Sequence, residues 1–218
     1  MNTNVNLAAP IGALALLGTA FILVVSGTIL IQSLIVRKRS RVKIVVPAML
    51  AIVGAYLAAM LIFSFASHET VLARGQEKHF CEIDCHLAYS IVNTTQAKTI
   101  GAAPNQIAAE GQFTIITIRT RFDETTISPR RGNGLLYPNS RKLTLIDYRG
   151  NRFGLASQLG TPLTTPLRPG DSYTTDLAFD LPADAKLATL IINEGEWETY
   201  FVIGHENSPL HRQTKFQV

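Results

Sequence analysis

A cluster of basic residues between two long apolar runs constrains the fold more than any other feature of this sequence. Five of the seven residues from Arg37 to Lys43 are Lys or Arg, whereas residues 11–36 and 44–66 contain no Asp, Glu, Lys or Arg. About 20 apolar helical residues cross a bilayer core that is about 30 Å thick, and both runs exceed that length. The pattern therefore predicts a transmembrane hairpin with helices at about 11–36 and 44–66.

The basic loop, residues 37–43, also predicts the orientation of the hairpin. Cytoplasmic loops are enriched in Lys and Arg, and residues 1–10 carry no charged side chain that would compete with this loop. A cleaved signal peptide is the alternative for the first run, but such peptides have a positive leading region and an apolar core of about 7–15 residues. We therefore expect a multi-pass protein of the cytoplasmic (inner) membrane, with the N-terminus and everything after Ala66 on the extracytoplasmic side.

The length and charge of the chain limit the remaining organisation. With 218 residues, the chain has room for a hairpin at 1–68, a polar stalk with a cysteine-containing lead-in at 69–84, and one domain at 85–218 that ends in a polar tail. The net charge is +4, but outside the loop the 15 remaining cations face 16 acids (20 minus 5 leaves 15). Nucleic acid is therefore not expected as a partner, whereas the lipid bilayer and an envelope or membrane protein are.

The residues after position 85 have the pattern of a β-sandwich. Alternation is clearest where Thr175, Leu177 and Phe179 point one way and polar residues the other. Turn residues separate the segments, and the Ala-rich stretch Pro104–Glu110 is the best candidate for a short helix. Six strands in about 140 residues predict a two-sheet, all-β antiparallel sandwich. The candidate strands are His86–Asn93, Gln112–Phe122, Lys142–Tyr148, Ser172–Asp180, Leu187–Asn193 and Glu198–Ile203, the last two joined by a hairpin at 194–196.

Four short motifs occur in an order that resembles a known family of domains. They are Gly111–Phe113, Leu145–Gly150, Pro169–Gly170 and Phe179–Pro182. This order is similar to that in the immunoglobulin-like, telokin-like domains of unknown function in bacterial envelope proteins, which commonly follow a lipoprotein signal or a membrane anchor. The resemblance covers about half of the chain, from Cys85 to Gly204, and implies an immunoglobulin-like sandwich. It implies little about function, because a fold of this kind hosts many functions.

Cys81 and Cys85 are the only cysteines. Outside the cytoplasm such a pair tends to form a disulfide. The three intervening residues must then turn, because Cα atoms in a disulfide lie within about 7 Å of each other. The alternatives are a redox-active dithiol and a copper or other metal site made of His79, Cys81, Cys85 and His86.

A two-helix anchor followed by a sandwich also resembles cytochrome oxidase subunit II, whose copper motif contains Cys-x-Glu-x-Cys. Here the acid directly follows Cys81, the cysteines come early in the domain, and no methionine follows Met60. These departures put a copper role in doubt. We find no sequence motif for a hydrolase or a phosphate loop. The sequence therefore predicts a non-enzymatic protein without catalytic residues, cofactor or metal.

Several further residues admit two interpretations. Trp197, the only tryptophan, is either an interface anchor or a core residue. Small residues in the apolar runs serve either to pack the hairpin or to dock another membrane subunit; they are Gly12, Gly18, Gly27, Gly54, Ala55, Ala58 and Ala59. The histidines of the tail are expected to be exposed or to cap the chain locally; they are His205 and His211. The acids at the predicted turn form either a solvated tip or a weak cation site; they are Glu194, Glu196 and Glu198. The cationic set forms either a solvated face or a contact with lipid headgroups or an acidic partner; it consists of Arg119, Arg121, Arg130, Arg131, Arg141 and Lys142.

Overall fold

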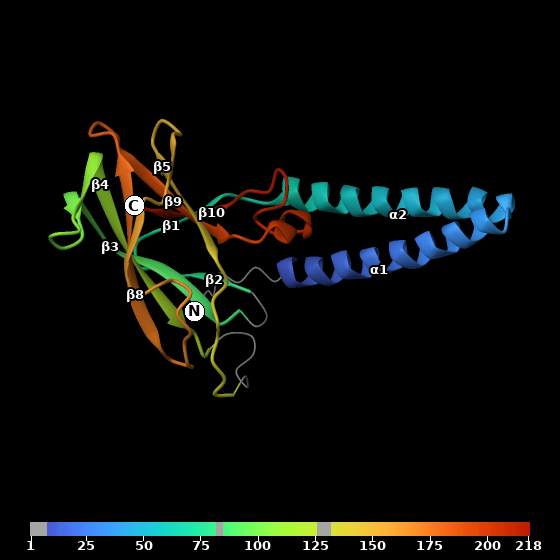
Figure 1. Ribbon diagram of the computed structural model, residues 1–218, viewed down its shortest axis with the longest axis horizontal. Helices are drawn as coiled ribbons and strands as arrows, with labels where there is room; N and C mark the ends of the chain where they lie inside the picture. Colours follow the sequence, from blue (N-terminus) through green and yellow to red (C-terminus); the bar gives the residue numbers. More distant parts are fainter. Residues whose placement is uncertain (1–7, 82–84, 126–131) are drawn as a thin grey trace. The chain divides into compact units, whose positions relative to one another are not determined.

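The computed structural model describes residues 8–81, 85–125 and 132–218 and divides the chain into two compact units (Figure 1). One unit contains the helices α1 (Ala8–Ile35) and α2 (Arg39–Ala66) together with residues 197–212. The other contains the strands that form the β-sandwich. The two units are described separately below.

The two helices are each 28 residues long, and both are long and apolar enough to cross a membrane. Their apolar side chains are largely exposed, so they are not core helices of a water-soluble fold. Helix α1 ends in a Schellman motif: Arg37 has a φ of +53°, and the Lys38 N–H donates to the Ser33 carbonyl at 2.9 Å.

The predicted loop, 37–43, is longer than the observed one, because α2 already begins at Arg39. Residues 39–43 begin α2, because charged side chains at a helix start do not prevent backbone hydrogen bonding. Pro47 therefore lies inside α2 and not at its start. Among the small residues, a Cβ at Gly18, Gly27 or Gly54 would meet no atom within 4 Å, so these glycines do not pack the hairpin.

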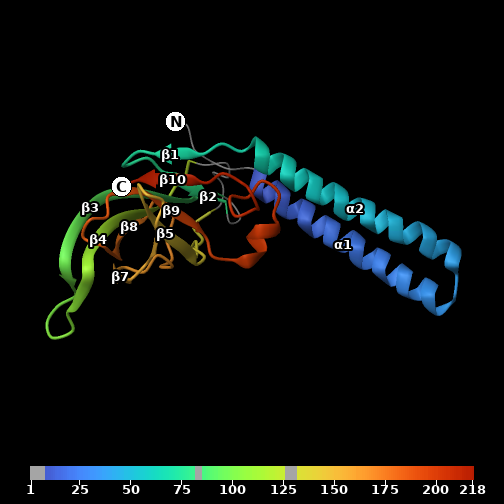
Figure 2. The same ribbon diagram turned by 90° about the horizontal axis from the view of Figure 1, so that it is seen from above.

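The sandwich has two five-stranded sheets (Figure 2). The first has the order β1-β10-β9-β5-β6 and the second the order β2-β3-β4-β8-β7. All pairs are antiparallel except β1 with β10, which is parallel. The strands are β1 (Thr70–Leu72), β2 (Lys78–Phe80), β3 (Leu87–Ile100), β4 (Ile107–Phe122), β5 (Arg141–Asp147), β6 (Arg152–Gly154), β7 (Ser157–Gly160), β8 (Ser172–Leu181), β9 (Leu187–Glu194) and β10 (Thr214–Gln217).

The core lies between the two sheets, as the alternating pattern predicts. Leu177 and Phe179 of β8 are fully buried, and they share one hydrophobic cluster with Leu145 of β5 and Leu190 of β9. Because a sheet buries every second residue of a strand, these positions place the apolar faces of both sheets against each other. The prediction of an immunoglobulin-like, two-sheet sandwich after two apolar helices is confirmed, except for the parallel pair.

Two segments that were predicted to lie outside the sandwich contribute strands to it. The expected stalk, 69–84, contains β1 and β2, each three residues long. The expected polar tail contains β10, whose Phe216 is fully buried between β1 and β9. These strands are too short to show a periodicity of their own, because their conformation depends on pairing with distant segments.

Two predictions of local structure are wrong. Residues 198–203 form no strand: a 3₁₀ helix, η1 (Trp197–Phe201), follows β9, and β10 pairs with β9 in place of the expected hairpin partner. The expected helix Pro104–Glu110 is replaced by a turn that leads into β4 at Ile107. With β3 this strand forms a long curved hairpin, visible in Figure 2, whose register shifts between Ile91 and Asn93 and again between Ala97 and Thr99.

Candidate functional site

Cys81 and Cys85 form a disulfide at the entrance to β3. Their Cα atoms lie 3.7 Å apart, and Cys85 adopts a φ of +57°, so the chain turns sharply at this position. The residues between them, 82–84, lie outside the described residues. Because both sulfur atoms are in the disulfide, the four-residue set His79, Cys81, Cys85 and His86 has no thiolate with which to hold copper or zinc.

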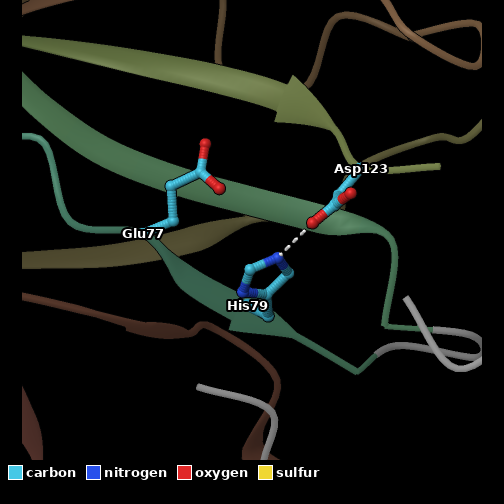
Figure 3. Close-up of side chains that lie close together, drawn as sticks. All are labelled: Glu77, His79 and Asp123. Atoms are coloured by element: carbon cyan, nitrogen blue, oxygen red, sulfur yellow. Dashed lines mark hydrogen bonds and ion pairs between the residues drawn. The ribbon is translucent and has the colours of Figure 1, made fainter. Parts of the chain in front are cut away.

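A group of charged side chains lies next to this disulfide. The polar cluster consists of Glu77, His79, Arg121 and Asp123; Figure 3 shows three of them. His79 on β2 and Arg121 on β4 are both in register with Ala88 of β3, which lies between them. Residues in register share one face of a sheet. The small Ala88 side chain therefore lets the two long polar side chains approach each other across β3, on the face opposite the core.

The side chains of the polar cluster contact one another closely. Arg121 donates two hydrogen bonds to Glu77, from Nε to Oε1 at 2.7 Å and from Nη2 to Oε2 at 2.6 Å. The same Nη2 lies 3.0 Å from Oδ2 of Asp123. His79 Nε2 lies 2.9 Å from that oxygen, the contact drawn as a dashed line in Figure 3. One guanidinium therefore joins both carboxylates, and the imidazole completes the group.

Asp123 is the central member of the polar cluster. Its side chain is 4% exposed, and its second oxygen, Oδ1, accepts hydrogen bonds from the backbone N–H and the hydroxyl of Thr125 at 2.9 and 2.7 Å. Its backbone N–H donates to the His86 carbonyl at 2.7 Å, and its own carbonyl lies 2.5 Å from His86 Nδ1. Asp123 thus connects the end of β4 to both β2 and the start of β3.

The contacts in the polar cluster shift the pKa values of both carboxyl groups. Burial raises the pKa of Asp123, but the Thr125 hydrogen bonds, His79 and Arg121 outweigh burial and hold it well below its usual value. The hydrogen bonds from Arg121 lower the pKa of Glu77, more than burial raises it. Glu77 also raises the pKa of Arg121. Both acids are therefore charged at neutral pH, and the cation between them neutralises part of that charge.

Two carboxylates and an imidazole are suitable ligands for a divalent cation, and their ligand atoms lie within 4.8 Å of one another. However, Arg121 already contacts both carboxylates at hydrogen-bond distance. A metal ion would have to displace this guanidinium and leave its charge unpaired, at a substantial cost in free energy. The residues therefore fit a closed ion-pair network better than a metal centre.

The pair His79–Asp123 also resembles the base and orienting carboxylate of a catalytic triad. Among the described residues, the second ring nitrogen of His79, Nδ1, is buried and has no hydrogen-bond partner. The His79 side chain is only 3% exposed, and the neighbouring cysteines are bonded to each other. A substrate and a nucleophile therefore have no access to the imidazole in this arrangement. The geometry favours a positioning role for this pair.

The polar cluster predicts that the sandwich loses stability in acid. Since the pKa values of Asp123 and Glu77 are lowered in the folded chain, the unfolded chain binds protons first as the pH falls. The stabilisation is complete above about pH 5 and declines as the pH falls through the usual carboxyl range near 4 and below. Hydrogen exchange of β2 and β3 amides in the full chain measures this decline. The variant Glu77→Gln should show a shallower slope below pH 5; an unchanged slope would contradict the assignment.

The other residues singled out in the sequence do not gather at one site. Arg119 and Arg121 lie on β4, whereas Arg141 lies on the other sheet, with its guanidinium carbon 4.3 Å from the centre of the Phe80 ring. The expected single cationic face is therefore wrong for these residues, and Arg130 and Arg131 lie outside the described residues. His205 is buried and Trp197 is 67% exposed.

Sequence reasoning missed Glu77 and Asp123 as members of a site. Alternation did contain a signal, because Glu77 and His79 lie two residues apart, as do Arg121 and Asp123. A strand places residues two apart on the same face. What the sequence lacks is the pairing of β2 and β4 with opposite edges of β3, which joins the two segments across 44 residues.

Comparison with known proteins supports no assignment of family or activity. No protein-family model and no curated protein matches the sequence. The chain is similar in fold to the secreted protein MPT63 of Mycobacterium tuberculosis, with a TM-score of 0.45 and 11% identity over 69% of this chain and 98% of that one. It is also similar to an uncharacterized β-sandwich protein from Clostridium difficile 630, with a TM-score of 0.40 and 8% identity over 70% and 95% of the two chains. These likenesses concern the fold alone.

Proposed function

We propose that this chain is a membrane-anchored, extracytoplasmic immunoglobulin-like protein that binds or braces another component of the cell envelope without catalysing a reaction. The observation that carries the proposal is the combination of two exposed apolar helices with a disulfide-bonded sandwich. Exposed apolar helices of this length are stable in lipid, and disulfides persist in oxidising compartments. Together they favour a hairpin in the cytoplasmic membrane and a sandwich on its outer side.

The polar cluster supports binding rather than catalysis as the role of the sandwich. Its charged groups are used in contacts with one another, and both of its buried side chains, His79 and Asp123, are at most 4% exposed. Its contacts link β2, the start of β3 and the end of β4, next to the disulfide. We assign it the task of holding these segments in place, so that the rest of the sandwich can present a stable surface to a partner.

Site-specific photo-cross-linking in cells tests this function. A photoreactive amino acid is placed at Tyr137 or Tyr148 of the sandwich, which are 66% and 61% exposed. The proposal predicts a reproducible cross-linked species at one or more exposed sandwich positions. The fully buried Phe179 is the matched negative position. If a scan of exposed sandwich positions yields no reproducible neighbour, the binding role is contradicted.

A second candidate, an accessory subunit of a membrane complex, is favoured by the exposed small residues of α2. Gly54 and Ala58 are both exposed, and no atom lies within 4 Å of a Cβ built at Gly54. Small residues allow close approach of another helix. Photo-cross-linking from Gly54 distinguishes this candidate, because it predicts a protein neighbour at the helix, whereas the leading proposal predicts one at the sandwich.

A further inference from the structure

Residues 197–212 are here called the docked segment. They contact the N-terminal part of α1 and the C-terminal half of α2, which lie away from the basic loop. The backbone of Ile203 lies so close to α1 that a Cβ at Gly12 would be 1.9 Å from the Ile203 oxygen. On α2 the Tyr56 hydroxyl donates to the Phe201 carbonyl at 2.5 Å. The Arg212 N–H donates to the Ser67 hydroxyl at 2.8 Å.

These contacts fix the depth of the docked segment along the helices. At a rise of about 1.5 Å per residue, Gly12 lies about 36 Å from Val36 at the other end of α1, and Ser67 about 36 Å from Lys43. A hydrocarbon core is about 30 Å thick. A bilayer that begins at the basic end of the hairpin therefore ends close to Gly12 and Ser67, and the docked segment lies at its surface. Tyr56 lies about 20 Å from Lys43, so its hydroxyl contacts the Phe201 carbonyl on the hydrocarbon side of that level.

The docked segment exposes four large apolar or aromatic side chains at this level. Trp197, Tyr200 and Phe201 are 67%, 42% and 52% exposed, and Leu210 is 64% exposed. Trp197 and Phe201 contact each other edge to face, with ring centres 6.0 Å apart. Aromatic residues with a polar atom are enriched where hydrocarbon meets the lipid headgroups. Glu198 is one third of a turn from Trp197 in η1, so its carboxylate can remain in water.

Hydrogen bonds within the docked segment satisfy part of its backbone, which favours contact with lipid. A series of turns three residues apart joins Val202 to Thr199, His205 to Val202, Ser208 to His205 and His211 to Ser208, with N to O distances between 2.9 and 3.3 Å. The Asn207 side chain donates to the Thr199 hydroxyl at 2.8 Å, and the Ser208 hydroxyl donates to the Val202 carbonyl. The Asn207 and Ser208 side chains thus bond within the segment, whereas its three large aromatic rings are exposed.

From this geometry we infer that the docked segment is a membrane-interface element, in which Trp197, Tyr200, Phe201 and Leu210 insert into the headgroup region opposite the basic loop. The occupant of this surface is the lipid bilayer. The inference rests on the proposed membrane anchor and adds a second membrane contact, made by a part of the chain that 130 residues (67–196) separate from α2. It explains why a 3₁₀ helix with exposed rings follows β9 where the sequence pattern predicts a strand.

Trp197 provides the test, because it is the only tryptophan in the chain. The full chain is reconstituted in phosphatidylcholine vesicles that contain lipids brominated at a shallow or a deep acyl position. We expect shallow bromines to remove roughly half of the Trp197 emission and to act more strongly than deep ones, as for a tryptophan at the interface. Equal emission with and without brominated lipid, together with full quenching by aqueous acrylamide, would overturn the inference.

Two tryptophan positions in a Trp197→Phe background separate failure of this inference from failure of the membrane anchor. Phe21→Trp, on α1, reports whether the hairpin is in hydrocarbon, and Tyr148→Trp, on the sandwich, provides a reference that acrylamide reaches. If Phe21→Trp is quenched by bromines and Trp197 is not, the inference is wrong and the anchor stands. If neither is quenched, the anchor is wrong as well. Exclusion of Trp197 from both bromines and acrylamide would indicate a protein partner and would also overturn the inference.

A matched pair of glycine variants tests whether α1 holds the docked segment in place. Gly12→Ala places a Cβ against the Ile203 backbone, whereas Gly18→Ala, on the same helix, places it in open space. We expect Gly12→Ala to reduce the bromine quenching of Trp197 and Gly18→Ala to leave it unchanged. Equal quenching in both variants would contradict the role of α1 in positioning the segment.

Discussion

Replacing Phe216 with alanine is expected to destabilise the sandwich by about 3–5 kcal/mol, the usual cost of removing a buried phenylalanine. Phe216 lies in the C-terminal segment Gln213–Val218, which belongs to the sandwich. Its side chain is fully buried and packs in the core cluster. It is in register with Leu72 of β1 on one side and with Leu190 of β9 on the other. Removal of its ring would therefore leave a cavity where the first and last strands of the sandwich meet.

Hydrogen exchange of the β5 and β9 amides in the full chain measures this effect, because it reports on the sandwich independently of the helices. The midpoint of thermal unfolding should fall by about 10 °C or more for a domain of this size. Gln217→Ala is the matched control, since Gln217 is the next residue of β10 and is exposed. Equal protection in both variants would mean that β10 contributes nothing to the core.

Replacing Asp123 with alanine is expected to cost about 3 kcal/mol, at the low end of values for breaking a buried ion pair because Arg121 is partly exposed and can regain water. The substitution removes the acceptor of His79 Nε2 and of two Thr125 donors, and it leaves Arg121 with Glu77 alone. Protection of the β2 amides should decrease most, since His79 on β2 loses its partner. Asp123→Asn, which keeps an acceptor for Thr125, should cost less.

The control for Asp123 is Asp184→Ala. The Asp184 side chain is 71% exposed and lies 3.4 Å from Arg149, so this ion pair should contribute less than about 1 kcal/mol. If Asp123→Ala is no more harmful than Asp184→Ala, the polar cluster does not hold β2, and our assignment of its role is wrong. A stability loss in Asp123→Ala that shrinks as the pH falls below about 4, where the unfolded reference chain binds protons before the folded one, would support it.

The sequence was sufficient to predict those parts of the fold that depend on local pattern. Uninterrupted apolar runs predicted both helices, and alternation predicted β8, because burial of one face repeats every two residues. The last strand was not predictable in this way: only Phe216 of β10 is buried, and a single buried residue has no period. Residues 198–203 alternate like a strand, yet Phe201 and Ile203 contact the helices, and those contacts cannot be inferred from spacing.

Only the part of the candidate site around the disulfide was predictable from the sequence. The spacing of Cys81 and Cys85 predicted a disulfide, and His79 and His86 were singled out as neighbours of it. The connection of His79 to Asp123 requires that β2 and β4 pair with opposite edges of β3. This pairing joins residues that are 44 apart in the sequence. The sequence therefore predicts Arg121 only as one of several surface cations and gives no role to Asp123.

We propose that the hairpin crosses the membrane with its basic loop inside the cell and the sandwich outside. Both native cysteines are in the disulfide, so a cysteine introduced elsewhere is the single target of a membrane-impermeant maleimide. In intact spheroplasts we expect labelling of Asp184→Cys, on the sandwich, and labelling of Lys38→Cys, between the helices, only after the membrane is permeabilised. Labelling of Lys38→Cys alone in intact spheroplasts would contradict this topology.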